Sequence, residues 1–458
     1  MTRLFALFVA LTLAAPVRGA DADLVFPNGE KPARLRIEVT DGGNSPEAAW
    51  GAFLDKFFAH FDRDGNGTLS EAEAKRVFPL PLPGGKAVAP DFAAMDADRD
   101  GKVTPAEFRA YYRAKGFTPV TVLVQPAPVE SLAVGDALFR HLDRDNDGKL
   151  SASELRQAVA LLKRFDEDED EVLTAAELLG GTASAPGAKP VGLKITTAEK
   201  VAPDATLRLD IGGKATLAVE GSAFRLSADG ARLRVPGGVC AVAVSRDDPA
   251  AGFRAAKAFY LAQFKAAAVN KPATKSLFED DPTAQVLAGL FDAADRDGDG
   301  KLTLAELEAL FDLVELGVGC RVVVTATDRG RNLFDLFDID GDGRLDLGEL
   351  LRAGRTLPEE LARAKPLERS AVPASYRLVA GRGPVGDSFG PVPFGAATKP
   401  KPPAPKAVRG PAWFRAMDKN GDGFVSVQEF VGPPELFAKL DANGDGRISV
   451  EEAEAAKP

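Results

Sequence analysis

Apolar residues recur along this chain with two periods, and each period predicts one kind of element. A helical period precedes residue 62, where the apolar stripe consists of Trp50, Phe53, Leu54, Phe57, Phe58 and Phe61. Short β-type runs predict strands at 34–39, 120–125, 321–327 and 376–381. The densest group of such runs lies within 190–246, with glycines between the runs, and predicts a small antiparallel β module.

Acidic segments of twelve residues interrupt this pattern eight times. They are numbered here loops 1 to 8 and begin at residues 62, 96, 143, 166, 295, 338, 418 and 441. Every loop has Asp at position 1, Asp or Asn at positions 3 and 5, and Glu at position 12; seven have Gly at position 6. Position 8 is always apolar, as Leu69, Val103, Leu150, Leu173, Leu302, Leu345, Val425 and Ile448. Because a solvated acidic surface has no need of an apolar residue there, we predict folded loops.

This spacing resembles the calcium loop of the EF-hand superfamily, and secreted bacterial proteins with multiple EF-hand pairs in particular. The resemblance implies Ca²⁺, bound by side chains at positions 1, 3, 5 and 12 and by the backbone carbonyl at position 7. Glycine at position 6 makes the sharp turn, because it enters the left-handed region without steric cost. The implied ligands are Asp62, Asp64, Asn66, Thr68 and Glu73; Asp96, Asp98, Asp100, Lys102 and Glu107; Asp143, Asp145, Asp147, Lys149 and Glu154; Asp166, Asp168, Asp170, Val172 and Glu177; Asp295, Asp297, Asp299, Lys301 and Glu306; Asp338, Asp340, Asp342, Arg344 and Glu349; Asp418, Asn420, Asp422, Phe424 and Glu429; and Asp441, Asn443, Asp445, Arg447 and Glu452.

Loop 4 departs from the pattern at one position. Glu171 stands at position 6, where a side chain costs about 1–2 kcal/mol of backbone strain. The remaining positions fit, so loop 4 is interpreted as an EF-hand with weakened binding rather than a disordered acidic run. Whether it holds calcium stays open.

The spacing of the loops predicts four sequential pairs, because short gaps separate loops 1 and 2, 3 and 4, 5 and 6, and 7 and 8. The predicted fold class is mainly α with β: four paired helix–loop–helix units joined by short strands, a small β-rich module and linkers rich in Pro and Gly, such as 399–406. The predicted domains are a signal peptide (1–22), a strand with pair 1 (23–118), a strand with pair 2 (119–185), the β-rich module (186–280), pair 3 (281–357), a linker (358–410) and pair 4 (411–458).

The N-terminus predicts export to the periplasm or the extracellular space. One arginine precedes an apolar run at 4–15, and small residues follow, as in a secretory signal peptide. Cleavage after Gly19 and cleavage after Ala22 both fit. No other apolar stretch is long enough to span a membrane.

Charge and composition narrow the function. A net charge of −10 argues against nucleic acid as a partner. The G-x-S-x-G sequence at 386–390 lacks a following helix pattern and a later histidine, and the only histidines, His60 and His141, precede loops 1 and 3. We therefore expect no enzyme. Cys240 and Cys320 leave two alternatives, a disulfide or two buried free thiols.

Three roles for calcium remain. The first is a stabilising ion in an exported binding protein. The second is a sensor that opens a groove for a target; only three methionines are present, which disfavours a Met-rich groove. The third is an adhesion or interaction protein whose β-rich module or EF-hand pairs bind a protein or polysaccharide.

Overall fold

The computed structural model of the chain describes residues 22–27, 31–82, 86–126, 129–166, 171–180, 192–197, 202–212, 216–221, 223–226, 232–245, 248–269, 271–282, 284–339, 343–353, 366–383, 410–419, 423–442 and 446–455. Residues 1–21 of the predicted signal peptide, the segment 399–406 and the sequence at 386–390 lie outside these ranges.

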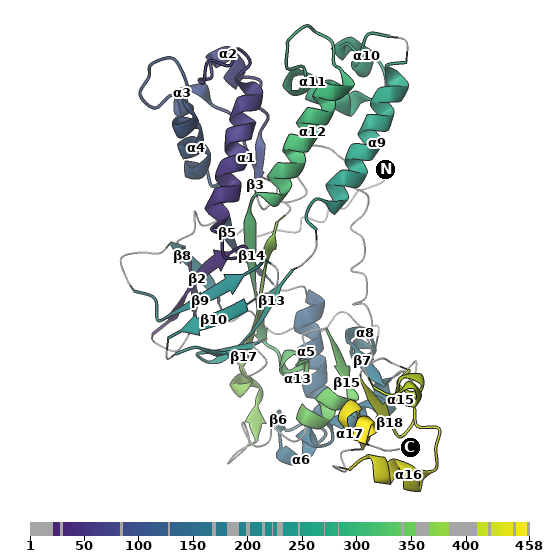
Figure 1. The fold of residues 1–458 in the computed structure, drawn as a ribbon. Helices are drawn as coiled ribbons and strands as arrows, with labels where there is room; N and C mark the ends of the chain where they lie inside the picture. The colour runs from purple at the N-terminus through teal and green to yellow at the C-terminus, as the bar shows by residue number, and fades with distance from the viewer. Residues whose placement is uncertain are drawn as a thin grey trace, which may run out of the picture.

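Two β-sheets pack on each other at the centre of the molecule (Figure 1). The first sheet has the order β10 (Thr216–Glu220), β9 (Ala205–Asp210), β2 (Ala33–Thr40), β1 (Ala22–Phe26) and β8 (Lys194–Thr197). The second has the order β11 (Arg225–Leu226), β12 (Arg232–Val235), β13 (Gly238–Val244), β17 (Ala374–Arg382), β14 (Val322–Arg331) and β5 (Val120–Pro126). A single apolar cluster takes Leu35 and Leu207 from the first sheet and Val324 and Leu378 from the second.

The helical segments are inserted between strands of these sheets. The neighbours β2 and β9, β13 and β17, and β5 and β14 run parallel, and parallel neighbours require long crossover connections. Helical segments supply much of these connections, so each segment that precedes β17 is anchored to the sheets at both ends, whereas the C-terminal helices follow the last sheet strand.

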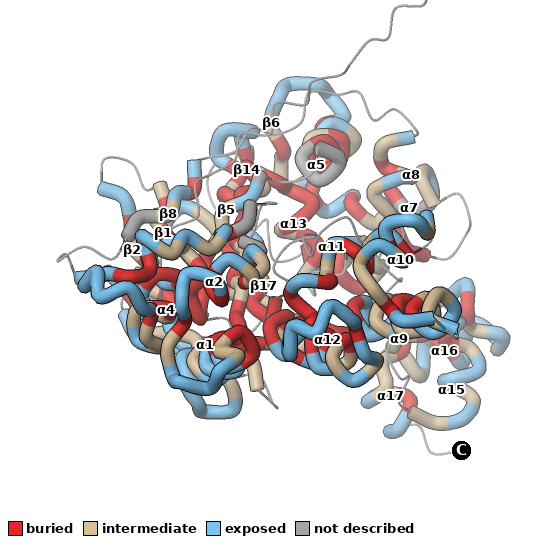
Figure 2. The backbone as a smooth tube through the Cα atoms, turned by 90° about the horizontal axis from the view of Figure 1, so that it is seen from above, coloured by how far each residue is buried: buried red, intermediate tan, exposed pale blue. Residues whose placement is uncertain are grey.

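One helical lobe lies above the sheets in Figure 1. It consists of α1 (Pro46–Phe61), α2 (Glu71–Ala74), α3 (Phe92–Met95), α4 (Pro105–Ala114), α9 (Ala251–Ala267), α10 (Lys275–Glu279), α11 (Gln285–Ala294) and α12 (Leu304–Gly319), with the hairpin β3 (Leu80–Leu82) and β4 (Lys86–Val88). Buried side chains of α1 and α12 belong to one core, and both helices carry buried positions in Figure 2. Gly317 permits their close approach, because a Cβ there would lie 2.7 Å from the Phe53 ring.

A second helical lobe lies below the sheets in Figure 1. It consists of α5 (Val129–Leu142), β6 (Lys149–Leu150), α6 (Ala152–Leu155), η1 (Ala158–Leu161), α7 (Leu162–Phe165), β7 (Val172–Thr174), α8 (Ala175–Leu179), α13 (Leu333–Phe337), β15 (Arg344–Asp346), the helical residues 347–353, β16 (Leu367–Glu368) and η2 (Arg369–Ala371). The C-terminal unit lies beside it, with α15 (Ala412–Met417), β18 (Phe424–Ser426), α16 (Pro434–Leu440), β19 (Arg447–Ser449) and α17 (Val450–Ala455).

The order of elements is repeated along the chain. In residues 33–180, the first repeat, β2 is followed by α1 to α4, β5, and then α5 to α8. In residues 238–371, the second repeat, β13 is followed by α9 to α12, β14, and then α13 to η2. Each lobe therefore combines a part of the first repeat with the corresponding part of the second.

The predicted strands at 34–39, 120–125, 321–327 and 376–381 fall on β2, β5, β14 and β17, and the fold contains both helices and sheets. The β structure is not a separate module at 186–280, however, because these distant strands complete its two sheets. Residues 251–267 and 275–279 within that range form helices α9 and α10.

The two cysteines are free thiols, so the disulfide alternative between Cys240 and Cys320 is wrong. Cys240 lies in the core between the sheets, whereas Cys320 lies in the core of the upper lobe. Strand β17 separates β13, which carries Cys240, from β14, which follows Cys320. Burial raises the pKa of both thiols to about 12.

Within the described residues, no helix combines the length and the apolar character needed to cross a membrane.

Candidate metal centres

Loop 1 shows how the acidic side chains are arranged. Asp62 follows α1, and its carboxylate accepts hydrogen bonds from the N–H groups of Asn66 at 3.1 Å and Gly67 at 2.9 Å. Asp64 accepts a second bond from Asn66 N–H at 3.0 Å. The bend that makes these contacts requires φ of +81° at Gly67, which favours glycine.

The glutamate at position 12 is held by its own loop. In loop 1, the N–H and hydroxyl of Ser70 donate to Glu73 Oε2 at 2.9 and 2.7 Å, and Arg63 N–H donates to Oε1 at 2.8 Å. The position-9 hydroxyl donates to the glutamate in the same way in Thr104–Glu107, Ser151–Glu154, Thr174–Glu177, Thr303–Glu306 and Ser449–Glu452. Position 9 therefore orients the glutamate in these loops.

Position 5 fixes the residue whose carbonyl is the implied ligand at position 7. Asp100, Asp147 and Asp299 each accept a hydrogen bond from the N–H two residues later, at 2.7–2.8 Å. Asn66 accepts the same bond from Thr68 at 2.8 Å.

Carboxylate oxygens converge in the four loops whose residues are all described. In each set the oxygens lie within 4.8 Å of one another; the sets are Asp62, Asp64 and Glu73; Asp96, Asp98 and Glu107; Asp143, Asp145 and Glu154; and Asp295, Asp297 and Asp299. Ligands on opposite sides of a calcium ion lie about 5 Å apart, because each Ca–O distance is about 2.3–2.6 Å. These all-oxygen sets therefore fit calcium, whereas zinc sites commonly include nitrogen or sulfur ligands.

Loops 4, 6, 7 and 8 share the same frame. Their position-1 aspartates accept a bond from the position-6 N–H at 2.9–3.0 Å: Asp166 from Glu171, Asp338 from Gly343, Asp418 from Gly423 and Asp441 from Gly446. Eight of their implied ligands fall outside the described residues, namely Asp168, Asp170, Asp340, Asp342, Asn420, Asp422, Asn443 and Asp445.

The backbone conformation of loop 4 agrees with its sequence. Glu171 has φ of +62°, so the loop makes the position-6 turn with a side chain present. This side chain is buried, and its Oε1 accepts a hydrogen bond from Ser426 Oγ at 2.6 Å. Ser426 is position 9 of loop 7, so loop 4 and the C-terminal unit are in direct contact.

Loop 6 holds a glutamate with a strongly shifted pKa. Burial, together with the nearby charges of Asp346 and Asp338, raises the pKa of Glu349 to about 8. The opposite shift occurs in loop 2, where hydrogen bonds from Thr104 lower the pKa of Glu107. A cation in loop 6 would offset the repulsion between these carboxylates and favour their ionised form.

The loops pair through short strands, as predicted for two of the four pairs. In the first pair, Leu69 and Val103 exchange backbone hydrogen bonds of 2.8 and 2.9 Å. In the C-terminal unit, Val425 of β18 is opposite Ile448 of β19.

The predicted pairing of loop 3 with loop 4 and of loop 5 with loop 6 is wrong. Strand β7 of loop 4 pairs with β15 of loop 6, and β6 of loop 3 pairs with β16. Loop 5 pairs with the segment before α10, because Leu302 N–H donates to Ala273 O at 2.8 Å. The parallel pair β5 and β14 brings the two repeats together, so the lower-lobe loops pair between repeats.

The partner of loop 5 is a helix–loop–helix unit without acidic ligands, which the sequence analysis missed. If Ala273 takes position 8, Thr274 takes position 9 and caps α10 by accepting a bond from Leu277 N–H, as position 9 does elsewhere. Positions 1, 3 and 12 are then Ala266, Ala268 and Leu277. A shared Lys-Pro before the pairing residue, at 271–272 and again at 365–366 before β16, is the signal that could have revealed both partners.

Both histidines form hydrogen bonds to backbone carbonyls within the helical lobes. His60 Nε2 donates to Ala293 O at 2.8 Å, and His141 Nε2 donates to Leu178 O at 3.0 Å. Burial lowers the pKa of both rings.

Comparisons with known proteins agree with this geometry. A model described as an EF-hand domain pair matches residues 327–432, one described as an EF-hand domain matches 136–163, and one described as an EF hand matches 91–110, 287–311 and 435–452. These ranges include loops 2, 3, 5, 6, 7 and 8. The chain therefore contains EF-hand domains, and calcium is the ion that it binds.

A curated relative from Oryza sativa subsp. japonica, "Probable calcium-binding protein CML16", is 33% identical over 111 residues, which are 23% of this chain and 55% of the relative. The chain thus spans about half the length of that relative. A solved structure described as a redox protein from Chlamydomonas reinhardtii matches with 19% identity over 30% of this chain and 48% of its own, with a TM-score of 0.12, and carries no argument about the fold.

Proposed function

We propose that the chain is an exported, non-catalytic protein whose eight loops bind calcium mainly to stabilise its folded structure. The observation that carries this proposal is the pairing of loops from different repeats. Loop 4 lies in the first repeat and loop 6 in the second, and their strands are hydrogen-bonded at Leu173 and Leu345. Ions in both loops would therefore hold together parts of the chain that are far apart in sequence.

Electrostatics support a stabilising role. The chain has a net charge of −10, and the loops gather just over half of its 67 acidic residues into small groups. Like charges a few ångströms apart repel one another, and each bound ion removes that repulsion in the folded state. Binding to the folded state alone stabilises it by about 2.7 kcal/mol per site when calcium is at 100 times the dissociation constant.

Thermal unfolding with calcium and with a chelator tests the proposal. We expect millimolar calcium to raise the melting temperature strongly. In limited proteolysis under chelator, cleavage should begin in the two helical lobes and leave the β-sheets protected longest, because the sheets carry no calcium loops. A melting temperature that chelator leaves unchanged would contradict a stabilising role and favour a sensor.

A second candidate function rests on the C-terminal unit. Its apolar side chains Val427, Val431 and Leu436 are 64%, 81% and 44% exposed. A contiguous apolar patch favours contact with another macromolecule, either a protein or a polysaccharide, and these three side chains are the candidates for such a patch. Calcium-dependent binding of a hydrophobic dye, reduced in Val431→Ser, would support this role, and dye binding that ignores calcium would count against it.

A further inference from the structure

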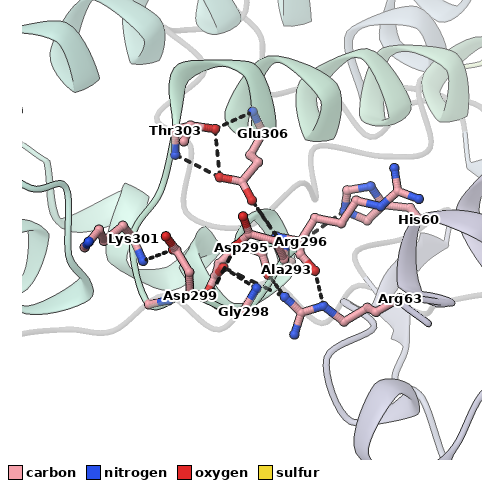
Figure 3. A network of polar contacts seen from close by, with 12 residues as sticks. His60, Arg63, Ala293, Asp295, Arg296, Gly298, Asp299, Lys301, Thr303 and Glu306 are labelled. Carbon is pink, nitrogen blue, oxygen red and sulfur yellow. Dashed lines mark hydrogen bonds and ion pairs between the residues drawn. The ribbon is translucent and has the colours of Figure 1, made fainter.

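Loops 1 and 5 contact each other although neither is the strand partner of the other. The Arg63 guanidinium, from position 2 of loop 1, donates hydrogen bonds to the backbone carbonyls of Asp295 and Arg296 (Figure 3). The same guanidinium lies 3.8 Å from Asp295 Oδ1. Only 18% of the Arg63 side chain and 8% of the Asp295 side chain are exposed, so solvent screens this contact weakly.

The contact is nearly symmetric. Arg296, at position 2 of loop 5, donates back to Ala59 O at 3.4 Å, and His60 Nε2 donates to Ala293 O at 2.8 Å. The C-terminal ends of α1 and α11 therefore face each other, and cationic side chains satisfy carbonyls at both ends. Cations at helix C-termini are favourable because they oppose the partial negative charge of the helix dipole.

Arg63 also connects the two groups of calcium ligands. Its backbone N–H donates to Glu73 Oε1, the position-12 carboxylate of loop 1, at 2.8 Å. Its side chain contacts Asp295, which is position 1 of loop 5, and packs against Gly298, where a Cβ would lie 2.9 Å from Nη1. Arg63 therefore links the position-12 ligand of loop 1 to the start of loop 5 through a single residue.

Loop 5 has particular need of such support. The strand partner of Leu302 is Ala273, whose segment has alanine at positions 1 and 3 and leucine at position 12. Because that segment has no carboxylates, calcium cannot bind there. Calcium therefore cannot order loop 5 by first ordering its strand partner.

We propose that Arg63 is a positioning residue for the calcium site of loop 5, and that it couples this site to loop 1. The inference rests on the proposed function, because it requires both loops to bind calcium. An ion in loop 1 fixes Glu73 and with it Arg63, and Arg63 then holds the backbone of Asp295 in the conformation that places its carboxylate toward the other ligands. Calcium in loop 1 therefore raises the affinity of loop 5, and by linkage the reverse also holds.

Hydrogen–deuterium exchange of the full chain, measured against free calcium, reads each loop separately. In Arg63→Ala, the calcium concentration that half-protects peptide 295–306 should rise about fivefold or more, the lower end of typical coupling between sites. Glu73→Gln, which removes the charge and one of the two ligand oxygens at position 12 of loop 1, should shift the same peptide in the same direction. The double variant should shift it no further than the larger single effect, because both changes break one connection.

Arg144→Ala is the matched control. Arg144 occupies position 2 of loop 3, but its guanidinium bonds to Gln157 of its own hand. This variant should leave peptide 295–306 unchanged. Arg63→Lys keeps the charge without the planar fork and, if Arg63→Ala fails to fold, should still show part of the shift.

The outcomes separate the two proposals. One outcome would overturn the coupling alone. In it, calcium protects the wild-type chain, but the calcium concentration that half-protects peptide 295–306 is unchanged or lower in both Arg63 variants. A lower midpoint would mean that repulsion between the guanidinium and the ion outweighs positioning. A wild-type chain whose exchange ignores calcium would overturn the proposed function and the coupling together.

Discussion

Replacing Glu171 separates the two effects that this residue has on loop 4. Its backbone has φ of +62°, a conformation that costs a residue with a side chain about 1–2 kcal/mol and costs glycine almost nothing. Its carboxylate accepts the 2.6 Å hydrogen bond from Ser426 of the C-terminal unit. Hydrogen bonds to charged groups typically contribute about 1.5–3 kcal/mol.

Glu171→Gly should therefore strengthen calcium binding by loop 4 and weaken the contact with the C-terminal unit. Relief of about 1–2 kcal/mol of strain corresponds to an increase in affinity of about five- to thirtyfold. Loss of the hydrogen bond should increase hydrogen–deuterium exchange in residues 423–429, because the C-terminal unit is then separated from loop 4 for a larger fraction of the time. The affinity of loop 4 and the stability of the C-terminal contact thus change in opposite directions.

Glu171→Ala is the control for this pair of effects. Alanine also lacks the carboxylate but keeps a Cβ at positive φ, so it should weaken the C-terminal contact equally and leave the strain of loop 4 in place. The assay is hydrogen–deuterium exchange of peptides 166–177 and 423–429 across a calcium titration. Equal loop 4 midpoints in the glycine and alanine variants would refute the strain argument, and unchanged exchange at 423–429 in both would refute the role of Glu171 in the contact.

Two further predictions concern pairing and export. Glu349→Gln should weaken calcium binding by loop 6 and reduce the calcium-dependent protection of its strand partner at 166–177, while the protection of 295–306 stays unchanged. The opposite pattern in hydrogen–deuterium exchange would support sequential pairing of the loops. If the chain is exported, N-terminal sequencing of the mature protein should show Ala20 and not Asp23 as its first residue, because Ala22 belongs to β1 and is paired with Thr197. A mature protein that starts at Asp23 would show that β1 forms without its first residue.

The loops could be predicted from the sequence because calcium binding depends on the identity and spacing of side chains. An ion needs oxygen atoms at fixed spacing, and Asp62, Asp64 and Glu73 supply them at positions that a reader can count. The strand at 34–39 could also be predicted, since its alternation of apolar residues reflects burial on one face. Both signals are local.

The partners of the loops could not be predicted in the same way. Strand pairing uses backbone N–H and C=O groups, which every residue except proline possesses, so Leu302 can pair with Ala273 as well as with another calcium loop. The contact of Arg63 with Asp295 spans more than two hundred residues and depends on how the upper lobe is assembled. The Arg63 contact leaves no pattern along the chain, and the local trace of the pairing at Ala273 is the short Lys-Pro sequence at 271–272.

This difference explains how helix–loop–helix units without ligands can persist among calcium loops. The segment around Ala273 occupies the place in the second repeat that loop 1 occupies in the first, after the first helix that follows the sheet strand. Its carboxylates are absent, yet Ala273 O still accepts the bond from Leu302 N–H, and Thr274 still caps the following helix. The two tasks of such a loop, pairing and ion binding, depend on different atoms, so one can be lost while the other is kept. A loop without ligands can complete the fold of its neighbour, and the ordering that an ion would provide must then come from another contact, as Arg63 is placed to do for loop 5.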